Sequence, residues 1–215
     1  MSKISRRSAL GAGVAAATAL GATVSAAQAG ADPAGKPGKP SGEAHPHLFH
    51  LSATTPSNYD GGNLRGANEQ NFPVLAGQDG SVYLVHLDPG GIREPHWHPT
   101  AWELNYIISG RAEWSILGTH PDGSYLNDVF TANRGDLVFA PQGFFHYFAN
   151  PSTTEGLDVL VMFNTSVAEP NDDIGVVGTL NSIPREVLAA SFGVPVSAFA
   201  AVPKDIKPVV ITKRR

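Results

Sequence analysis

The chain has 215 residues, of which 42% are hydrophobic and 16% are charged, so it carries enough apolar material for one globular domain. Its net charge of −4 excludes the extended basic surface that nucleic-acid binding requires. It has no cysteine, which excludes disulfides and thiolate chemistry and restricts any metal site to histidine and carboxylate ligands.

Residues 1–29 have the pattern of a cleavable export signal. Lys3 and the pair Arg6–Arg7 precede a short run rich in alanine and glycine, and Ala27–Gln28–Ala29 ends it. The run is too short for a membrane span, so we expect a mature protein without membrane segments. The paired arginines resemble the twin-arginine signal and predict export to the periplasm or the medium. An ordinary secretion signal is the alternative.

Residues 30–46 are rich in glycine, proline, lysine and serine, which predicts a disordered leader. The remaining residues, 47–215, are expected to form a single domain. Leu48–Leu51 is predicted as its first strand, followed by a glycine- and asparagine-rich connection that reaches Pro73.

Short apolar runs separated by glycine and proline turns then predict an all-β sandwich or barrel over about residues 72–165. The predicted strands are residues 82–87, 104–108, 112–117, 137–140, 145–148 and 159–163. Ser109–Gly110 joins the second and third of these and predicts a hairpin.

The C-terminal part, about residues 182–203, has a helical pattern. Ser182, Pro184 and Glu186 predict the start of a helix that Gly193 ends, and a shorter helix is expected over residues 197–201. We expect this extension to cover an edge of the barrel or to pack on a partner subunit.

Four side chains have the residue types and the spacing of a metal site. Residues two apart on a strand point to the same face, so His96 and His98 project together, and Glu103 can complete the set. His146 lies on a further predicted strand after a turn. A single buried histidine is more often a hydrogen-bonded core residue, but four residues in one pattern favour a metal.

Other histidines provide a comparison within the chain. His45–Pro46–His47 has the same spacing but lies beside the polar leader without a carboxylate, so we interpret it as solvated. His50, His86 and His120 are interpreted as structural or surface residues.

The surroundings of these four residues resemble the two motifs of the cupin family. The matching positions are Gly90, His96, His98, Glu103 and Gly110 in the first motif, and Gly135, Pro141, Gly143, His146 and Asn150 in the second. The resemblance implies a small jelly-roll β-barrel that holds the four ligands inside.

Further stretches resemble the oxalate decarboxylase branch of the family: residues 71–73, 91–99, 107–112 and 184–193. The resemblance implies that Arg93 contacts a substrate carboxylate, and a guanidinium is suited to that role because its planar fork matches a carboxylate. The alternative is an ion pair of Arg93 with Glu94 or with an exposed acid.

The chain also departs from that branch. Decarboxylases of this type usually have two cupin domains, whereas this chain has one, as in germins and spherulins. The family's decarboxylating domain carries an acid on a mobile lid. Residues 165–173 are the matching segment, and Glu169 is the candidate acid, with Asp172 and Asp173 as alternatives. A solvated acidic loop is the other interpretation.

The resemblance therefore predicts a metalloenzyme acting on a small carboxylate, foremost oxalate, which would give formate and carbon dioxide. We expect manganese, with iron, zinc and copper as alternatives, and dioxygen as co-substrate or mediator. A germin-like oxalate oxidase or superoxide-dismutating site, and a non-catalytic metal- or acid-binding protein, are the other candidates. A homo-oligomer is expected.

Overall fold

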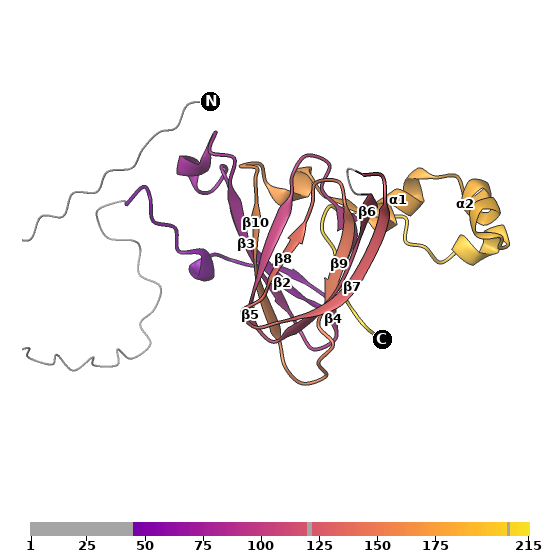
Figure 1. The fold of residues 1–215 in the computed structure, drawn as a ribbon, viewed down its shortest axis with the longest axis horizontal. Helices are drawn as coiled ribbons and strands as arrows, with labels where there is room; N and C mark the ends of the chain where they lie inside the picture. The colour runs from indigo at the N-terminus through magenta and orange to yellow at the C-terminus, as the bar shows by residue number, and fades with distance from the viewer. Residues whose placement is uncertain (1–44, 120–121, 206) are drawn as a thin grey trace, which may run out of the picture. The chain divides into compact units, whose positions relative to one another are not determined.

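The computed structural model describes residues 45–119, 122–205 and 207–215 (Figure 1). The predicted export signal and nearly all of the predicted leader lie outside the described residues, so both stay predictions. Within the described ranges, no helix has the length and apolar character needed to cross a membrane.

Two antiparallel sheets face each other and confirm the predicted all-β barrel with C-terminal helices (Figure 1). The first sheet consists, in spatial order, of β1 (Ser57–Tyr59), β2 (Gly62–Ala67), β3 (Ser81–Leu87), β10 (Leu157–Phe163), β5 (Glu103–Ser109) and β8 (Leu137–Ala140). The second consists of β11 (Ile174–Gly175), β4 (Gly91–Trp97), β9 (Phe145–Ala149), β6 (Arg111–Thr119) and β7 (Tyr125–Asn133), with β12 (Ile211–Lys213) also paired to β4.

The core lies between the two sheets. Along β3 and β10 every second side chain is buried, as the period of two of a half-buried strand requires. Trp114 from β6 stacks on Phe148 from β9 with ring centroids 4.7 Å apart, and both are fully buried. Burial of such apolar area is the main favourable term that holds the sheets together.

The predicted hairpin at Ser109–Gly110 is wrong. The two strands form, but β5 pairs with β8 and β10, whereas β6 pairs with β7 and β9 in the other sheet. The turn carries the chain from one sheet to the other. A turn signal between two apolar runs does not reveal whether the strands pair or separate, because both arrangements bury the same residues.

The N-terminal part of the domain also differs from expectation. The strand predicted at Leu48–Leu51 is absent, and a short 3-10 helix, η1 (Leu51–Ala53), stands at its end. The sheet begins at β1, before the expected limit of residue 72. The glycine-rich β2, interpreted as a connection, pairs with β3 because Gly66 lets its backbone lie against the Tyr83 ring; a Cβ there would be 2.4 Å from that ring.

The predicted C-terminal helix is confirmed as α2 (Arg185–Phe192), which ends at Gly193 in the left-handed conformation with φ 65°. The shorter predicted helix is the 3-10 helix η4 (Val196–Phe199). Phe192 packs on Phe199 with ring centroids 5.5 Å apart, and Figure 1 shows this pair of helices away from the sheets. Helix α1 (Val176–Ser182) was not predicted; together with β11 it connects the barrel to α2.

The remaining short elements are the 3-10 helices η2 (Pro73–Leu75) and η3 (Glu169–Asn171). The second of these lies within residues 165–173, which are called the strap below.

Gly66→Ala should destabilise the protein by about 1–3 kcal/mol, because the added methyl group must displace the buried Tyr83 ring. Urea unfolding followed by circular dichroism measures this change. Gly80→Ala is the matched control, since the nearest atom to its added Cβ is 3.9 Å away. Equal stability of the two variants would contradict the packing of β2 described here.

Candidate metal centre

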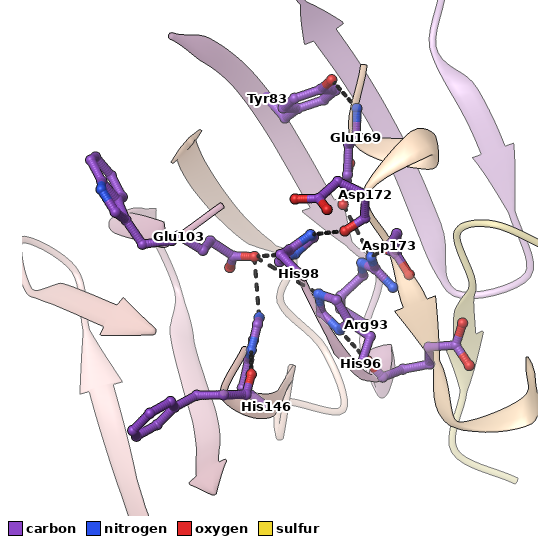
Figure 2. A network of polar contacts seen from close by, with 12 residues as sticks. Tyr83, Arg93, His96, His98, Glu103, His146, Glu169, Asp172 and Asp173 are labelled. Atoms are coloured by element: carbon purple, nitrogen blue, oxygen red, sulfur yellow. Dashed lines mark hydrogen bonds and ion pairs between the residues drawn. The ribbon is translucent and has the colours of Figure 1, made fainter. Parts of the chain in front are cut away.

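Both sheets contribute to one cluster inside the barrel, which Figure 2 shows from close by. His96 on β4 lies directly opposite His146 on β9, and His98 follows β4 by one residue. Glu103 begins β5 and projects toward them from the facing sheet. All four side chains are buried.

Three of the four predicted ligands, the histidines, converge on a carboxylate oxygen of the fourth, Glu103. Glu103 Oε2 lies 3.1 Å from His98 Nε2, 3.2 Å from His146 Nε2 and 3.8 Å from His96 Nε2. One ligand atom from each residue lies within 4.8 Å of all the others. Bonds from a metal to nitrogen or oxygen are about 2.0–2.2 Å, so a single ion could contact all four atoms after small adjustments.

The protonation of the histidines favours a cation between them. In each ring Nδ1 lies 2.7 or 2.8 Å from a backbone carbonyl oxygen, which only accepts, so Nδ1 carries the proton. In the neutral ring the unprotonated Nε2 then points its lone pair at the Glu103 carboxylate, which is also an acceptor. A cation bound between these acceptors would accept their lone pairs and remove the repulsion between them.

Burial and charge act in opposite directions on the groups of the cluster. Burial lowers the pKa of His96 well below its ordinary value. Burial disfavours charge on His98 as well, but the hydrogen bond and charge of Glu103 outweigh it and raise the pKa of His98. Burial also disfavours charge on Glu103, yet the histidines around it hold its pKa well below the usual range. Glu103 is therefore an anion that needs positive neighbours.

Arg93 lies on the same strand as His96, with its side chain buried at the edge of the cluster (Figure 2). Its Nη2 donates to Glu169 Oε1 at 3.0 Å and also pairs with the Asp173 carboxylate. Within the described ranges its Nη1 has no hydrogen-bond partner. The acids that Arg93 contacts thus come from the strap.

The strap is closed over the cluster, so its interpretation as a solvated loop is wrong. Glu169 is buried and its backbone N–H donates to Tyr83 Oη at 2.6 Å. Asp172 is buried too, and its carboxylate accepts the backbone N–H of Thr100 at 3.0 Å. Of the three candidate lid acids, Glu169 and Asp173 face Arg93, whereas Asp172 fastens the strap to the loop between β4 and β5.

Acidic groups exceed basic ones around the cluster. Four carboxylates are buried here, and Arg93 is the one buried arginine or lysine side chain among the described residues. The carboxylates belong to Glu103, Glu169, Asp172 and Asp173. Because an uncompensated buried charge is costly, this excess of negative charge favours a divalent cation among the three histidines.

A second group of possible ligands consists of His98, Glu169 and Asp173. It shares His98 with the first group, and its two acids already bind the Arg93 guanidinium. Among the described residues, the carboxylate of the first group pairs only with histidines and with no guanidinium, so the first group is the better cation site.

Sequence patterns did not reveal every residue at the centre. Tyr83 was not predicted, and Asp172 was predicted only as an alternative acid, not as the partner of His98. Their contacts with Glu169 and His98 join segments 86 and 74 residues apart, and spacing carries no signal for such contacts. Of the other histidines, His45, His47 and His50 are exposed, and His86 pairs with Asp158 at 2.7 Å near the surface. His120 lies outside the described residues.

Known proteins resemble this chain over most of the described domain. A family model described as Cupin matches residues 49–198. An oxalate decarboxylase of Arthroderma benhamiae is 30% identical over 150 residues, covering 70% of this chain and 33% of that protein. A germin-like protein of Arabidopsis thaliana, subfamily 2 member 3, is 28% identical over 169 residues, covering 74% of this chain and 73% of that protein.

Solved structures of an oxalate decarboxylase also resemble this chain. The structure of oxalate decarboxylase from Bacillus subtilis matches with a TM-score of 0.65 and 28% identity, covering 78% of this chain and 41% of that one. A further structure of that enzyme concerns its Mn(II) centres. The chain therefore spans less than half the length of the decarboxylases that it matches.

In metal-free protein at about pH 8, where free histidine is neutral, His96 and His146 should carry their proton on Nδ1. Two-bond proton–nitrogen correlation spectra distinguish the tautomers, and single His→Gln variants assign the signals. The exposed His50 is the internal reference. Protonated Nε2 atoms in the two buried rings would contradict the arrangement described above.

Proposed function

The chain belongs to the cupin family, and we propose that it is a manganese-dependent enzyme that acts on a small carboxylate, foremost oxalate, releasing carbon dioxide and formate. The convergence of His96, His98, His146 and Glu103 on one point, beside the buried Arg93, carries this proposal. Three imidazoles and one carboxylate would hold the ion, and the buried guanidinium on the same strand as His96 could bind an anion beside it.

Manganese is proposed because an oxalate decarboxylase with 28% identity has Mn(II) centres and because the ligand set suits it. Zinc and copper compete at nitrogen and oxygen ligands, and copper binds more tightly in general. We propose that the twin-arginine route exports the protein folded, which would let the metal load inside the cell before export.

When bound, the metal would supply redox chemistry and a positive charge for the substrate carboxylate. The residues of the chain bind and orient that substrate. Arg93 offers it a planar donor fork, whose Nη1 has no hydrogen-bond partner in the described part of the chain. The strap must yield part of its contact with Arg93 as the substrate enters, because Glu169 and Asp173 occupy Nη2.

Glu169 is the proposed acid. Its Oε1 rests on Arg93, and its buried Oε2 has no partner among the described residues. An acid held at that place could deliver a proton to the carbon that loses carbon dioxide, which would give formate. Asp173 has the same contact with Arg93 and is the competing candidate.

A germin-like oxidase is the second candidate function. One observation supports it: a germin-like protein is 28% identical to this chain over 169 residues, the same identity as the structure of the Bacillus subtilis decarboxylase. In that case the strap acid would not deliver a proton, and oxalate would be oxidised to two molecules of carbon dioxide while dioxygen is reduced to hydrogen peroxide. A non-catalytic cupin that binds a metal or a small acid is the third.

Manganese-loaded protein supplied with oxalate and dioxygen should produce formate. Glu169→Gln should lower that rate by a factor of about 10²–10⁴ with manganese content unchanged, because a positioned acid contributes this much. Asp173→Asn separates the two candidate acids, and Glu186→Gln on the exposed face of α2 is the control.

Formate, peroxide and metal content are measured on the same samples. Peroxide in place of formate would favour the oxidase, and absence of turnover with manganese bound would favour the binding protein. Unchanged formate production by Glu169→Gln would refute the role of that acid.

We also propose that the C-terminal helices pack on a second copy of the chain. Val187 and Phe192 on α2 and Val196 on η4 are 51%, 64% and 46% exposed, and apolar side chains in such a group favour association. Light scattering should show an oligomer that the double substitution Val187→Ser with Phe192→Ser dissociates. Leu48→Ser, at an equally exposed residue, should leave it intact. A monomeric wild-type protein would contradict the proposal.

A further inference from the structure

The three histidines of the proposed metal centre differ in which segment supplies the hydrogen-bond acceptor for Nδ1–H. The Nδ1–H of His96 donates to the carbonyl oxygen of Glu94, and that of His146 donates to the carbonyl oxygen of Phe144. In both cases the acceptor lies two residues earlier on the same strand or its entry. These two rings are therefore oriented by the barrel itself.

His98 differs because its acceptor belongs to the strap. Its Nδ1–H donates to the carbonyl oxygen of Asp172 at 2.7 Å, across 74 residues of sequence (Figure 2). The carboxylate of the same residue accepts the Thr100 N–H, at 3.0 Å from one oxygen and 3.3 Å from the other. Asp172 thus holds the strap to the segment that follows His98 and supplies the acceptor for its ring.

We propose that Asp172 is a positioning residue that couples closure of the strap to metal binding through His98. This inference rests on the proposed metal centre. With the strap closed, the carbonyl fixes the ring so that Nε2 points at Glu103, at 3.1 Å. When the strap opens, His98 loses this acceptor while His96 and His146 keep theirs.

The coupling has a defined magnitude because linkage is reciprocal. Loss of the group that accepts the Nδ1–H of a metal-bound histidine typically weakens metal binding about 10–100-fold. The metal must then favour the closed strap over the open one by the same factor. Metal release and strap opening are therefore linked. The substrate competes with the strap for Arg93, so it favours the open strap.

Hydrogen exchange read by mass spectrometry tests the coupling in the full-length wild-type protein, without and with Zn²⁺ or Mn²⁺. Amides of residues 165–175 should exchange about ten-fold or more slowly once metal is added. Their protection comes from bonds that exist only in the closed strap, such as Glu169 N–H to Tyr83 Oη. Exchange in β7, which is remote from the strap, should not change.

Three variants test the role of Asp172. Asp172→Ala removes the carboxylate that anchors the strap to Thr100 and should weaken Zn²⁺ and Mn²⁺ binding about ten-fold in chelator competition. Asp172→Asn keeps an acceptor oxygen for the Thr100 N–H and should retain most of the affinity. Asn171→Ala, at the exposed neighbouring position, is the matched control and should bind as the wild type does.

The Mn²⁺ electron paramagnetic resonance spectrum provides a readout that a general loss of stability would not move. It should change in Asp172→Ala, where His98 is no longer fixed, and stay as in the wild type in Asn171→Ala. Circular dichroism confirms that the variants are folded.

The outcomes separate this inference from the proposed function. Wild-type protein that binds neither metal overturns the metal centre and this coupling with it. Metal that binds without slowing exchange in the strap overturns the coupling alone, as does an affinity of Asp172→Ala equal to that of the wild type. Slowed exchange together with a matching loss of affinity in Asp172→Ala supports it.

Discussion

An excess of buried negative charge around Glu103 is the constraint on which the rest of the site depends. Glu103 ends inside the barrel among three rings whose Nδ1–H groups face carbonyl oxygens, so while the rings are neutral none of them directs a proton at its charge. The strap adds the acids Glu169 and Asp173. Among the described residues, Arg93 alone forms ion pairs with them. In a medium of low dielectric such an arrangement is costly without a cation. The barrel interior that stabilises the fold is therefore also what makes the histidine cluster a place for a metal.

One irregularity in a strand makes this arrangement possible. Simple alternation along β4 would put Arg93 and His96 on opposite faces of the sheet, because they are three residues apart. The register of β4 against β9 shifts between these two residues, and both side chains turn into the barrel while Glu94 packs on the outer side, against Gly175. A substrate anion could then reach the guanidinium and the metal together. The bulge thus brings Arg93 and His96, the two groups proposed to act on the substrate, to the same side of a single strand.

The fold class and the grouping of His96, His98, Glu103 and His146 were predictable, because strand periodicity and motif spacing are local signals. The strand partners were not. The turn at Ser109–Gly110 looks like a hairpin, yet β5 and β6 lie in different sheets, and only the packing of the whole barrel decides between the two. The glycine-rich β2 has the composition of a loop and becomes a strand because Gly66 fits beneath Tyr83. The contacts of the strap escape sequence patterns for the same reason, since each joins segments far apart in the chain.

Charge also links the strap to the chemistry proposed for it. Arg93 is already matched by two acids when the strap is closed, and a substrate carboxylate brings further negative charge to the same guanidinium. Like charges so close together in a buried site repel, and wherever the proposed metal does not offset this repulsion, bound substrate favours withdrawal of the strap or a proton on one of its acids. The second route places a protonated carboxyl group beside the bound substrate, which is what proton delivery to a carbon atom requires. The first opens the site and, through Asp172, loosens His98. The same pair of acids can therefore serve both as a gate and as a proton source, and which role prevails depends on whether the strap stays closed once the substrate is bound.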